Sequence, residues 1–205
     1  MYRTRFVVAI AGAILSWSSG ERLAFSDRLE STLDQPLREI SHAVDVSVVD
    51  GIATYTVRRS FANRGKRHDE AMLWINLPYG AAATGLRIRS GKRWYKGDLL
   101  KRDVAAERYE KLTGLGAAIP RDPALLQWVW TDQLRLQLFP IPPEGTATVE
   151  YTLTSPTNYA GGRYSFSYAR HDGSETLAVP VIRVLPQQSK ATMFSYYGHA
   201  KVNQR

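Results

Sequence analysis

The chain has 205 residues, of which 44% are hydrophobic and 22% are charged. This composition is typical of a folded globular domain rather than a disordered chain. The sequence contains no cysteine, which excludes disulfide bonds, thiolate metal sites and a cysteine nucleophile. The formal net charge of +8 favours anionic partners such as nucleic acid, anionic lipid or acidic glycans. Because the basic residues are scattered along the chain, we expect no nucleic-acid partner.

The N-terminal residues follow the order of a secretory signal peptide. Arg3 and Arg5 precede an apolar run over residues 6–15, and small residues occupy positions 18–20. This order predicts that residues 1–20 are a signal peptide, and an uncleaved N-terminal anchor is the alternative. We therefore expect an exported protein, located in the periplasm, at the cell surface or on the inner membrane, with membrane contact through this segment only.

From Leu37 onward, apolar residues recur at every second position, which is typical of strands with one buried face. Asp50 and Gly51 interrupt this pattern. An Asp-Gly pair predicts a tight hairpin, because both central turn positions require positive φ. The pattern gives the first strand a buried face of Ile40, His42, Val44, Val46 and Val48. It gives the return strand a buried face of Ala53, Tyr55, Val57, Arg59 and Phe61.

Several further short strands are predicted downstream. A helix is predicted over residues 102–112, because Val104, Arg108 and Leu112 fall on one helical face. Many short strands separated by turn signals indicate a β-sandwich or a barrel. We therefore predict a mostly β fold, an antiparallel β-sandwich with one short crossing α-helix. The expected strands are residues 71–77, 84–88, 94–97, 125–130, 134–139, 146–153, 164–168 and 177–185.

Short motifs occur in a characteristic order between Leu37 and Pro156. They are Phe61-Ala62-Asn63, Glu70-Ala71 before a strand ending in Leu77-Pro78, Gly97, Ala105, Tyr109-Glu110, Phe139-Pro140-Ile141-Pro142-Pro143 and Glu150-Tyr151. With this order and spacing, the segment resembles the VIT domain, named for the vault protein and the inter-alpha-trypsin inhibitor heavy chains. The run Arg121-Asp122-Pro123-Ala124-Leu125, followed by Trp128, is similar to the bacterial exported branch of that family.

The resemblance implies a non-catalytic protein-interaction or scaffolding module of the bacterial cell envelope. Family members usually continue into a von Willebrand factor type A domain, for which too little sequence follows the matching block. The expected partner is therefore another protein or such a domain on a companion chain, and a truncated fragment of a longer protein is an alternative. We divide the chain into residues 1–20, a VIT-like β-sandwich over residues 24–156, and C-terminal strands with a frayed tail over residues 157–205.

The sequence contains little that suggests catalysis. Its four histidines form no metal-binding pattern, and neither a serine-hydrolase elbow nor a phosphate-binding loop is present. We therefore expect no catalytic, metal or cofactor site. An enzyme would need His68, Asp69 and Asp122 to converge in a cleft.

Aromatic residues provide the candidate interaction surface. Alternation predicts that Trp128 and Trp130 share one strand face, and Arg135 and Trp94 are expected to lie on the same surface. Packing of Trp128 and Trp130 in the core is the other interpretation of this pattern. If the face is open, it suits a protein partner, and a carbohydrate- or polyanion-binding module is the alternative, because sugars stack on aromatic rings. Three aromatic residues are expected to anchor the core instead, namely Phe61, Trp74 and Phe139.

Overall fold

The computed structural model describes residues 5–10, 27–97, 111, 124–168, 174–185, 191–195 and 201–202. Its strands are β1 (Arg5–Ile10), β2 (Arg28–Ser31), β3 (Leu37–Val49), β4 (Ile52–Asn63), β5 (Asp69–Asn76), β6 (Ala82–Ser90), β7 (Arg93–Lys96), β8 (Ala124–Trp130), β9 (Gln133–Ile141), β10 (Thr146–Pro156), β11 (Asn158–Ala160), β12 (Arg163–Phe166), β13 (Val181–Leu185), β14 (Ala191–Ser195) and β15 (Lys201–Val202). The prediction of a mostly β fold is confirmed.

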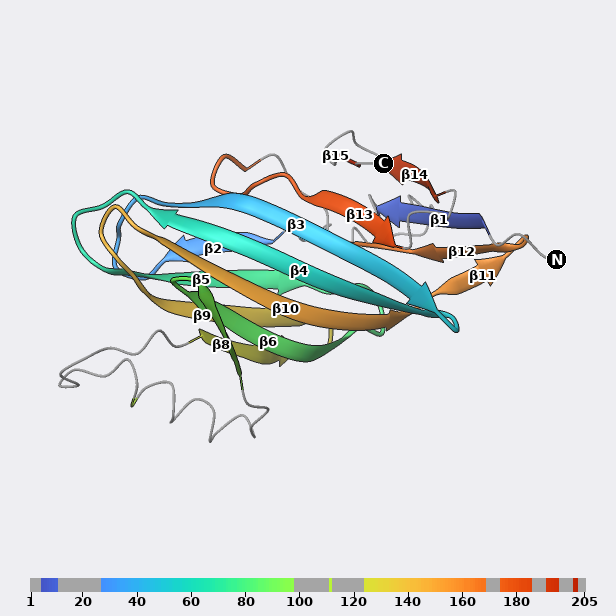
Figure 1. Cartoon of the computed structure of the whole chain (residues 1–205), viewed down its shortest axis with the longest axis horizontal. Coiled ribbons are helices and arrows are strands. Elements are labelled where there is room, and N and C mark those ends of the chain that lie inside the picture. Colours follow the sequence, from blue (N-terminus) through green and yellow to red (C-terminus); the bar gives the residue numbers. More distant parts are fainter. Residues whose placement is uncertain are drawn as a thin grey trace, which may run out of the picture.

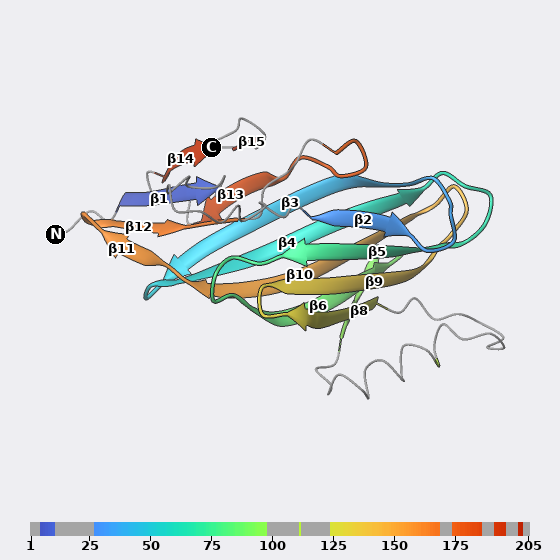
Figure 2. The ribbon, with the colours of Figure 1, turned by 180° about the vertical axis from the view of Figure 1, so that it is seen from behind.

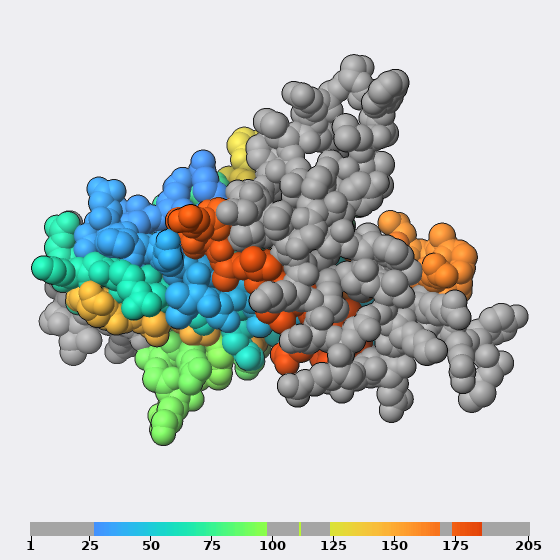
Figure 3. All heavy atoms as spheres, turned by 90° about the horizontal axis from the view of Figure 1, so that it is seen from above, coloured from blue at the N-terminus to red at the C-terminus, as the bar shows by residue number. Residues whose placement is uncertain are grey.

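Two sheets stack as the layers of a sandwich (Figures 1 and 2). One sheet has seven strands in the order β15-β13-β3-β4-β10-β6-β7, and the other has four in the order β2-β5-β9-β8. A third sheet has the order β11-β12-β1-β14. Seen from above, the hairpin formed by β6 and β7 projects from the body of the molecule as the green segment of Figure 3.

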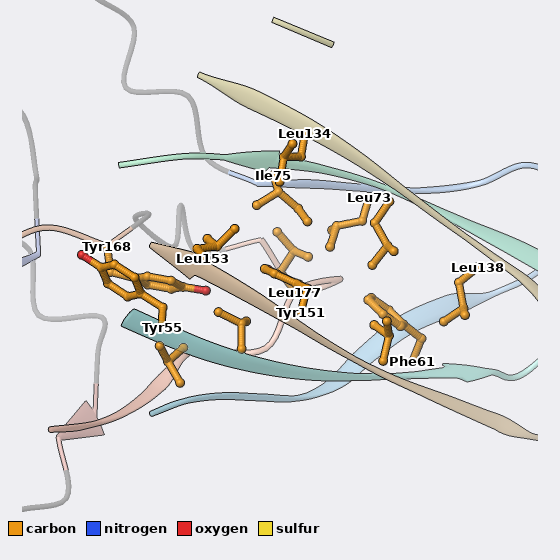
Figure 4. Close-up of a cluster of buried hydrophobic side chains, with 14 of the residues drawn as sticks. Tyr55, Phe61, Leu73, Ile75, Leu134, Leu138, Tyr151, Leu153, Tyr168 and Leu177 are labelled. Atoms are coloured by element: carbon orange, nitrogen blue, oxygen red, sulfur yellow. The ribbon is translucent and has the colours of Figure 1, made fainter. Parts of the chain in front are cut away.

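The core fills the space between the two main sheets. Tyr55 and Tyr168 lie together at one end of the cluster, and Phe61 and Leu138 lie at the other (Figure 4). The apolar residues of β4 and β5 face this core at every second position, as the sequence pattern predicts. Burial of such side chains stabilises the fold by about 1.5–3 kcal/mol each.

The β3–β4 hairpin forms at the predicted turn. Asp50 and Gly51 have φ angles of 50° and 78°, and the flanking Val49 and Ile52 pair directly. Only short polar residues and glycine adopt this region readily, which explains why the chain reverses here.

The predicted buried face of β3 is wrong at its first residue. The β3–β4 register shifts between Glu39 and Ser41, so Ile40 is 50% exposed while Leu37 and Glu39 point into the sandwich. An extra residue in one strand reverses the alternation on that side of the bulge. His42, Val44 and Val46 are buried, as the pattern predicts.

Two of the three expected core aromatics lie elsewhere. Phe61 is fully buried, but Trp74 and Phe139 are half-buried on the outer side of the four-stranded sheet. Leu73 and Leu138 face the core. Because successive side chains of a strand point to opposite sides, Trp74 and Phe139, which directly follow them, face outward.

The segment predicted to be helical lies outside the described residues, apart from Lys111, which is helical. In the parts of the chain that the structure describes, no helix has the length and apolar character that a membrane crossing requires. Residues 5–10 form β1, which runs parallel to β12 and β14. Export through an N-terminal signal peptide stays a prediction.

The C-terminal region adds a strand to the larger sheet. Residues 181–185 form β13, which starts later than the predicted strand at Leu177 and runs parallel to β3. Ile182 of β13 is fully buried. This region therefore contributes to the sandwich core.

Candidate interaction surface

The outer side of the four-stranded sheet carries polar and aromatic side chains in two rows. Strand register aligns Arg28, Trp74, Arg135 and Gln127 in one row across all four strands. A neighbouring row contains Asn76, Gln133 and Trp130. We call these residues the polar–aromatic face: Arg28, Trp74, Asn76, Gln127, Trp130, Gln133 and Arg135.

Contacts within the polar–aromatic face hold its side chains in place. The guanidinium carbons of Arg28 and Arg135 lie 5.4 and 5.8 Å from the centre of the Trp74 ring. Such cation–π contacts are worth about 0.5–1 kcal/mol at exposed sites. Arg135 also donates through Nη2 to Gln127 Oε1 at 2.9 Å. The two arginines and Trp74 therefore form one stacked group.

Three nitrogen donors on this face lack an acceptor. Trp74 Nε1, Asn76 Nδ2 and Arg135 Nε are buried and have no hydrogen-bond partner among the described residues. A buried unpaired donor costs about 1–3 kcal/mol, and most buried polar atoms in folded proteins are paired. Because these three atoms are buried, an external partner reaches them only if the side chains that cover them move.

The structure separates the two tryptophans that the sequence pattern placed together. The β8–β9 register shifts between Trp128 and Trp130, so Trp128 pairs with Leu134 on the core side and Trp130 pairs with Gln133 on the outer side. The interpretation that both rings share one strand face is therefore wrong, because Val129 is an extra residue in the strand. Both rings are nevertheless exposed, Trp128 to 40% and Trp130 to 69%.

Trp94 lies on β7 in the other main sheet and does not join the polar–aromatic face. Its ring stacks beneath Arg87 and Arg58, whose guanidinium carbons are 4.7 and 5.5 Å from the ring centre. Both arginines bind Glu150, at 2.5 and 2.6 Å. Burial opposes ionisation of this carboxyl, but the two arginines outweigh burial and lower the pKa of Glu150.

A buried ionic network lies inside the sandwich. Arg59, which is 1% exposed, donates to both carboxylate oxygens of Glu39 at 2.6 and 3.0 Å and to Asp27 at 2.5 Å. Burial would lower the pKa of Arg59, but Glu39, Tyr151 and Asp27 outweigh burial and hold that pKa well above its ordinary value. The guanidinium therefore stays charged inside the core.

The network also joins the flanking segments to the sandwich. Glu39 Oε2 accepts a hydrogen bond from the backbone of Ala178, and His42 Nε2 lies 2.8 Å from the Tyr168 hydroxyl. The sequence pattern already placed Arg59 on a buried strand face. An arginine on a buried face predicts a buried carboxylate partner. The sequence could not identify the partners, Glu39 and Asp27, because they are distant from Arg59 along the chain. We assign the network a structural role.

Of the three residues considered for an enzyme, the structure describes His68 and Asp69. Asp69 is fully buried, and its Oδ1 accepts hydrogen bonds from the backbone of Leu33 and Glu70. His68 is exposed, and Asp122 lies outside the described residues. No three potential metal ligands lie together among the residues that the structure describes.

The model of one protein family, described as the vault protein inter-alpha-trypsin domain, matches residues 40–153, more than half of the chain. The chain belongs to the VIT family. The match begins within β3 and ends within β10, so it includes strands of both main sheets. The comparison with curated proteins found no match. VIT domains are generally non-enzymatic, and membership suggests a non-catalytic protein-interaction module.

Proposed function

We propose that this VIT protein is an exported interaction module of the bacterial cell envelope that binds another protein through its polar–aromatic face. The observation that carries this proposal is the 69% exposed Trp130, which lies beside the group of Arg28, Arg135 and Trp74 on one side of the sheet. Tryptophan and arginine dominate the binding energy of many protein interfaces. The face therefore has the residue types that an interface requires.

The chemistry of the face defines the partner. The face carries the cations Arg28 and Arg135, with the amides of Gln127 and Gln133 beside them. A matching protein surface would present backbone carbonyls or carboxylates together with an apolar patch for Trp130. Because family members usually carry a von Willebrand factor type A domain, such a domain on a companion chain is the first partner to test.

A pull-down from envelope extract with the full chain tests the proposal. We expect a protein partner that is retained at high salt and is lost with Trp130→Ala/Arg135→Ala. The matched control is Tyr159→Ala/Arg64→Ala, which also removes an exposed aromatic ring and an exposed cation, but from β11 and from the loop between β4 and β5. Equal retention by both variants would show that the polar–aromatic face is not the contact surface.

A carbohydrate is the second candidate ligand for the same face. Asn76, Gln127 and Gln133 provide amides beside the exposed Trp130, and an aromatic ring with neighbouring hydrogen-bonding groups suits a sugar. Retention of glycans without any protein partner would favour this candidate over a protein partner.

A further inference from the structure

The β6–β7 hairpin concentrates positive charge. Residues 82–97 contain five lysines and arginines and no acidic residue. The five cations are all exposed: Arg87, Arg89, Lys92, Arg93 and Lys96. We call them the basic hairpin. They lie on the segment that projects from the body of the molecule in Figure 3.

The charge of the basic hairpin is only partly neutralised. Glu150 binds Arg87 but shares its carboxylate with Arg58. Arg89 donates to the backbone oxygen of Gly91 rather than to an acid. Among the described residues, Glu150 is the only carboxylate in a salt bridge with this hairpin. The hairpin therefore keeps a strong excess of positive charge that faces solvent.

The arrangement of these cations favours an extended anionic surface over a single bound anion. Arg87 pairs with Lys96 on one side of the hairpin, whereas Arg93 pairs with Ser90 on the other side. A site for one phosphate or carboxylate needs donors that converge, as in bidentate arginine binding. Here the charges are distributed over both sides and the tip, so they match many anions spread over a plane.

The tip and the aromatic residues also suit a membrane surface. A Cβ placed on Gly91 would meet no atom within 4 Å, so the turn is unobstructed. Tyr95 is 52% exposed, and Trp94 is half-buried beneath its two arginines. Tyrosine and tryptophan concentrate at the headgroup level of bilayers. This combination of aromatic and basic residues favours a lipid headgroup layer over an acidic protein.

We propose that the basic hairpin docks the protein on anionic phospholipid headgroups. This contact goes beyond the proposed function and beyond the membrane contact expected of the N-terminal segment. It uses none of the residues of the polar–aromatic face, so either proposal can fail without the other. The contact is electrostatic, and it weakens as salt rises because exposed charges are screened.

Co-sedimentation of the full chain with vesicles tests the proposal. The probes are vesicles of phosphatidylcholine alone and vesicles that also contain phosphatidylglycerol. Near an anionic bilayer, each lysine or arginine raises partitioning roughly fivefold. Lys92→Glu/Arg93→Glu should therefore reduce the bound fraction on phosphatidylglycerol vesicles at least about tenfold. The unmodified chain should bind these vesicles more strongly than neutral ones, and less strongly at high salt.

The matched control is Arg64→Glu/Lys66→Glu, on the exposed loop between β4 and β5. Each double variant changes the formal charge of +8 by −4, to +4, and each keeps the N-terminal segment. Equal loss of binding in both variants would mean that net charge alone acts and would overturn the proposal. Binding equal to that on neutral vesicles would also overturn it. So would hairpin-dependent binding of polyglutamate without binding of vesicles, which would indicate an acidic protein partner.

Discussion

Arg59 holds two carboxylates inside an otherwise apolar sandwich. Burial of a charge costs several kcal/mol, and only close pairing and additional hydrogen bonds offset that cost. Arg59 meets this condition through two bonds to Glu39 and one to Asp27. Burial raises the pKa of Glu39, because it outweighs the attraction of Arg59. Without Arg59 the ionised carboxylate would have still less support in the core.

Loss of the arginine should therefore be severe. Arg59→Met leaves Glu39 and Asp27 buried without a cation, and we expect the free energy of unfolding to fall by about 3–5 kcal/mol. Urea denaturation followed by tryptophan fluorescence measures this change. Arg64→Met, on an exposed loop, should change stability by less than about 0.5 kcal/mol. Equal midpoints for the two variants would contradict the assigned role of the network.

Glu150 predicts a specific dependence of stability on pH. Because its pKa in the folded state is lower than the ordinary 4.5, the ionised carboxylate stabilises the fold above about pH 4.5. That contribution is lost as the pH falls through the folded-state pKa. Glu150→Gln should therefore have a melting temperature that falls less than that of the unmodified chain between about pH 5 and pH 3.

Thermal melting at a series of pH values checks this expectation. Glu175→Gln serves as the control, because the Glu175 side chain is 90% exposed. This substitution should leave the dependence of the melting temperature on pH unchanged. A Glu150→Gln profile parallel to that of the unmodified chain would show that the arginine pair does not stabilise the ionised carboxylate.

Among the elements, β13 provides the clearest test. It pairs with β3 from Val181 to Leu185 and buries Ile182. Removal of residues 169–205 exposes the edge of β3, whereas removal of residues 186–205 leaves β13 in place. We expect the free energy of unfolding of the shorter chain to fall by at least about 3 kcal/mol, because the core no longer contains the buried side chains of Ile182 and Leu177. It should also self-associate through the free edge.

Thermal melting and size-exclusion chromatography compare the two truncated chains. A monomer of unchanged stability after removal of residues 169–205 would show that β13 is dispensable. A loss of stability of the same size in both chains would assign the effect to residues 186–205 instead.

Alternation of apolar residues predicted the faces of β4 and β5, because one side of each strand is buried and the other is not. It failed at Ile40 and Val129, where a bulge adds a residue without changing the composition of the strand. In the candidate surface, the sequence could predict Trp130 as a surface aromatic residue and Arg135 as a basic residue near it. The alternation along β5 also places Trp74 on the outer side, opposite Leu73 and Ile75. Its contacts with Arg28 and Arg135 could not be predicted, because they depend on the register of the neighbouring strands.

For the whole molecule, the sandwich is larger than the segment that matches the family. Asp27 and Glu39 precede residue 40, and Ile182 follows residue 153. Both carboxylate partners of Arg59 therefore lie outside the match. The two proposed surfaces likewise lie on different sheets, since Arg135 belongs to β9 and Lys92 lies between β6 and β7. Variants of each surface can therefore be combined to test whether the two contacts are independent.

The parallel pairing of β3 with β13 also governs how the molecule responds to tension. A pull applied where the chain enters β3 at Leu37 and leaves β13 at Leu185 acts at opposite ends of two strands that run in the same direction. The two strands must then slide past each other. The hydrogen bonds that join residues 43–47 of β3 to residues 181–185 of β13 are strained together rather than broken one by one. This geometry resists extension, so single-molecule stretching along this axis should meet a high rupture force.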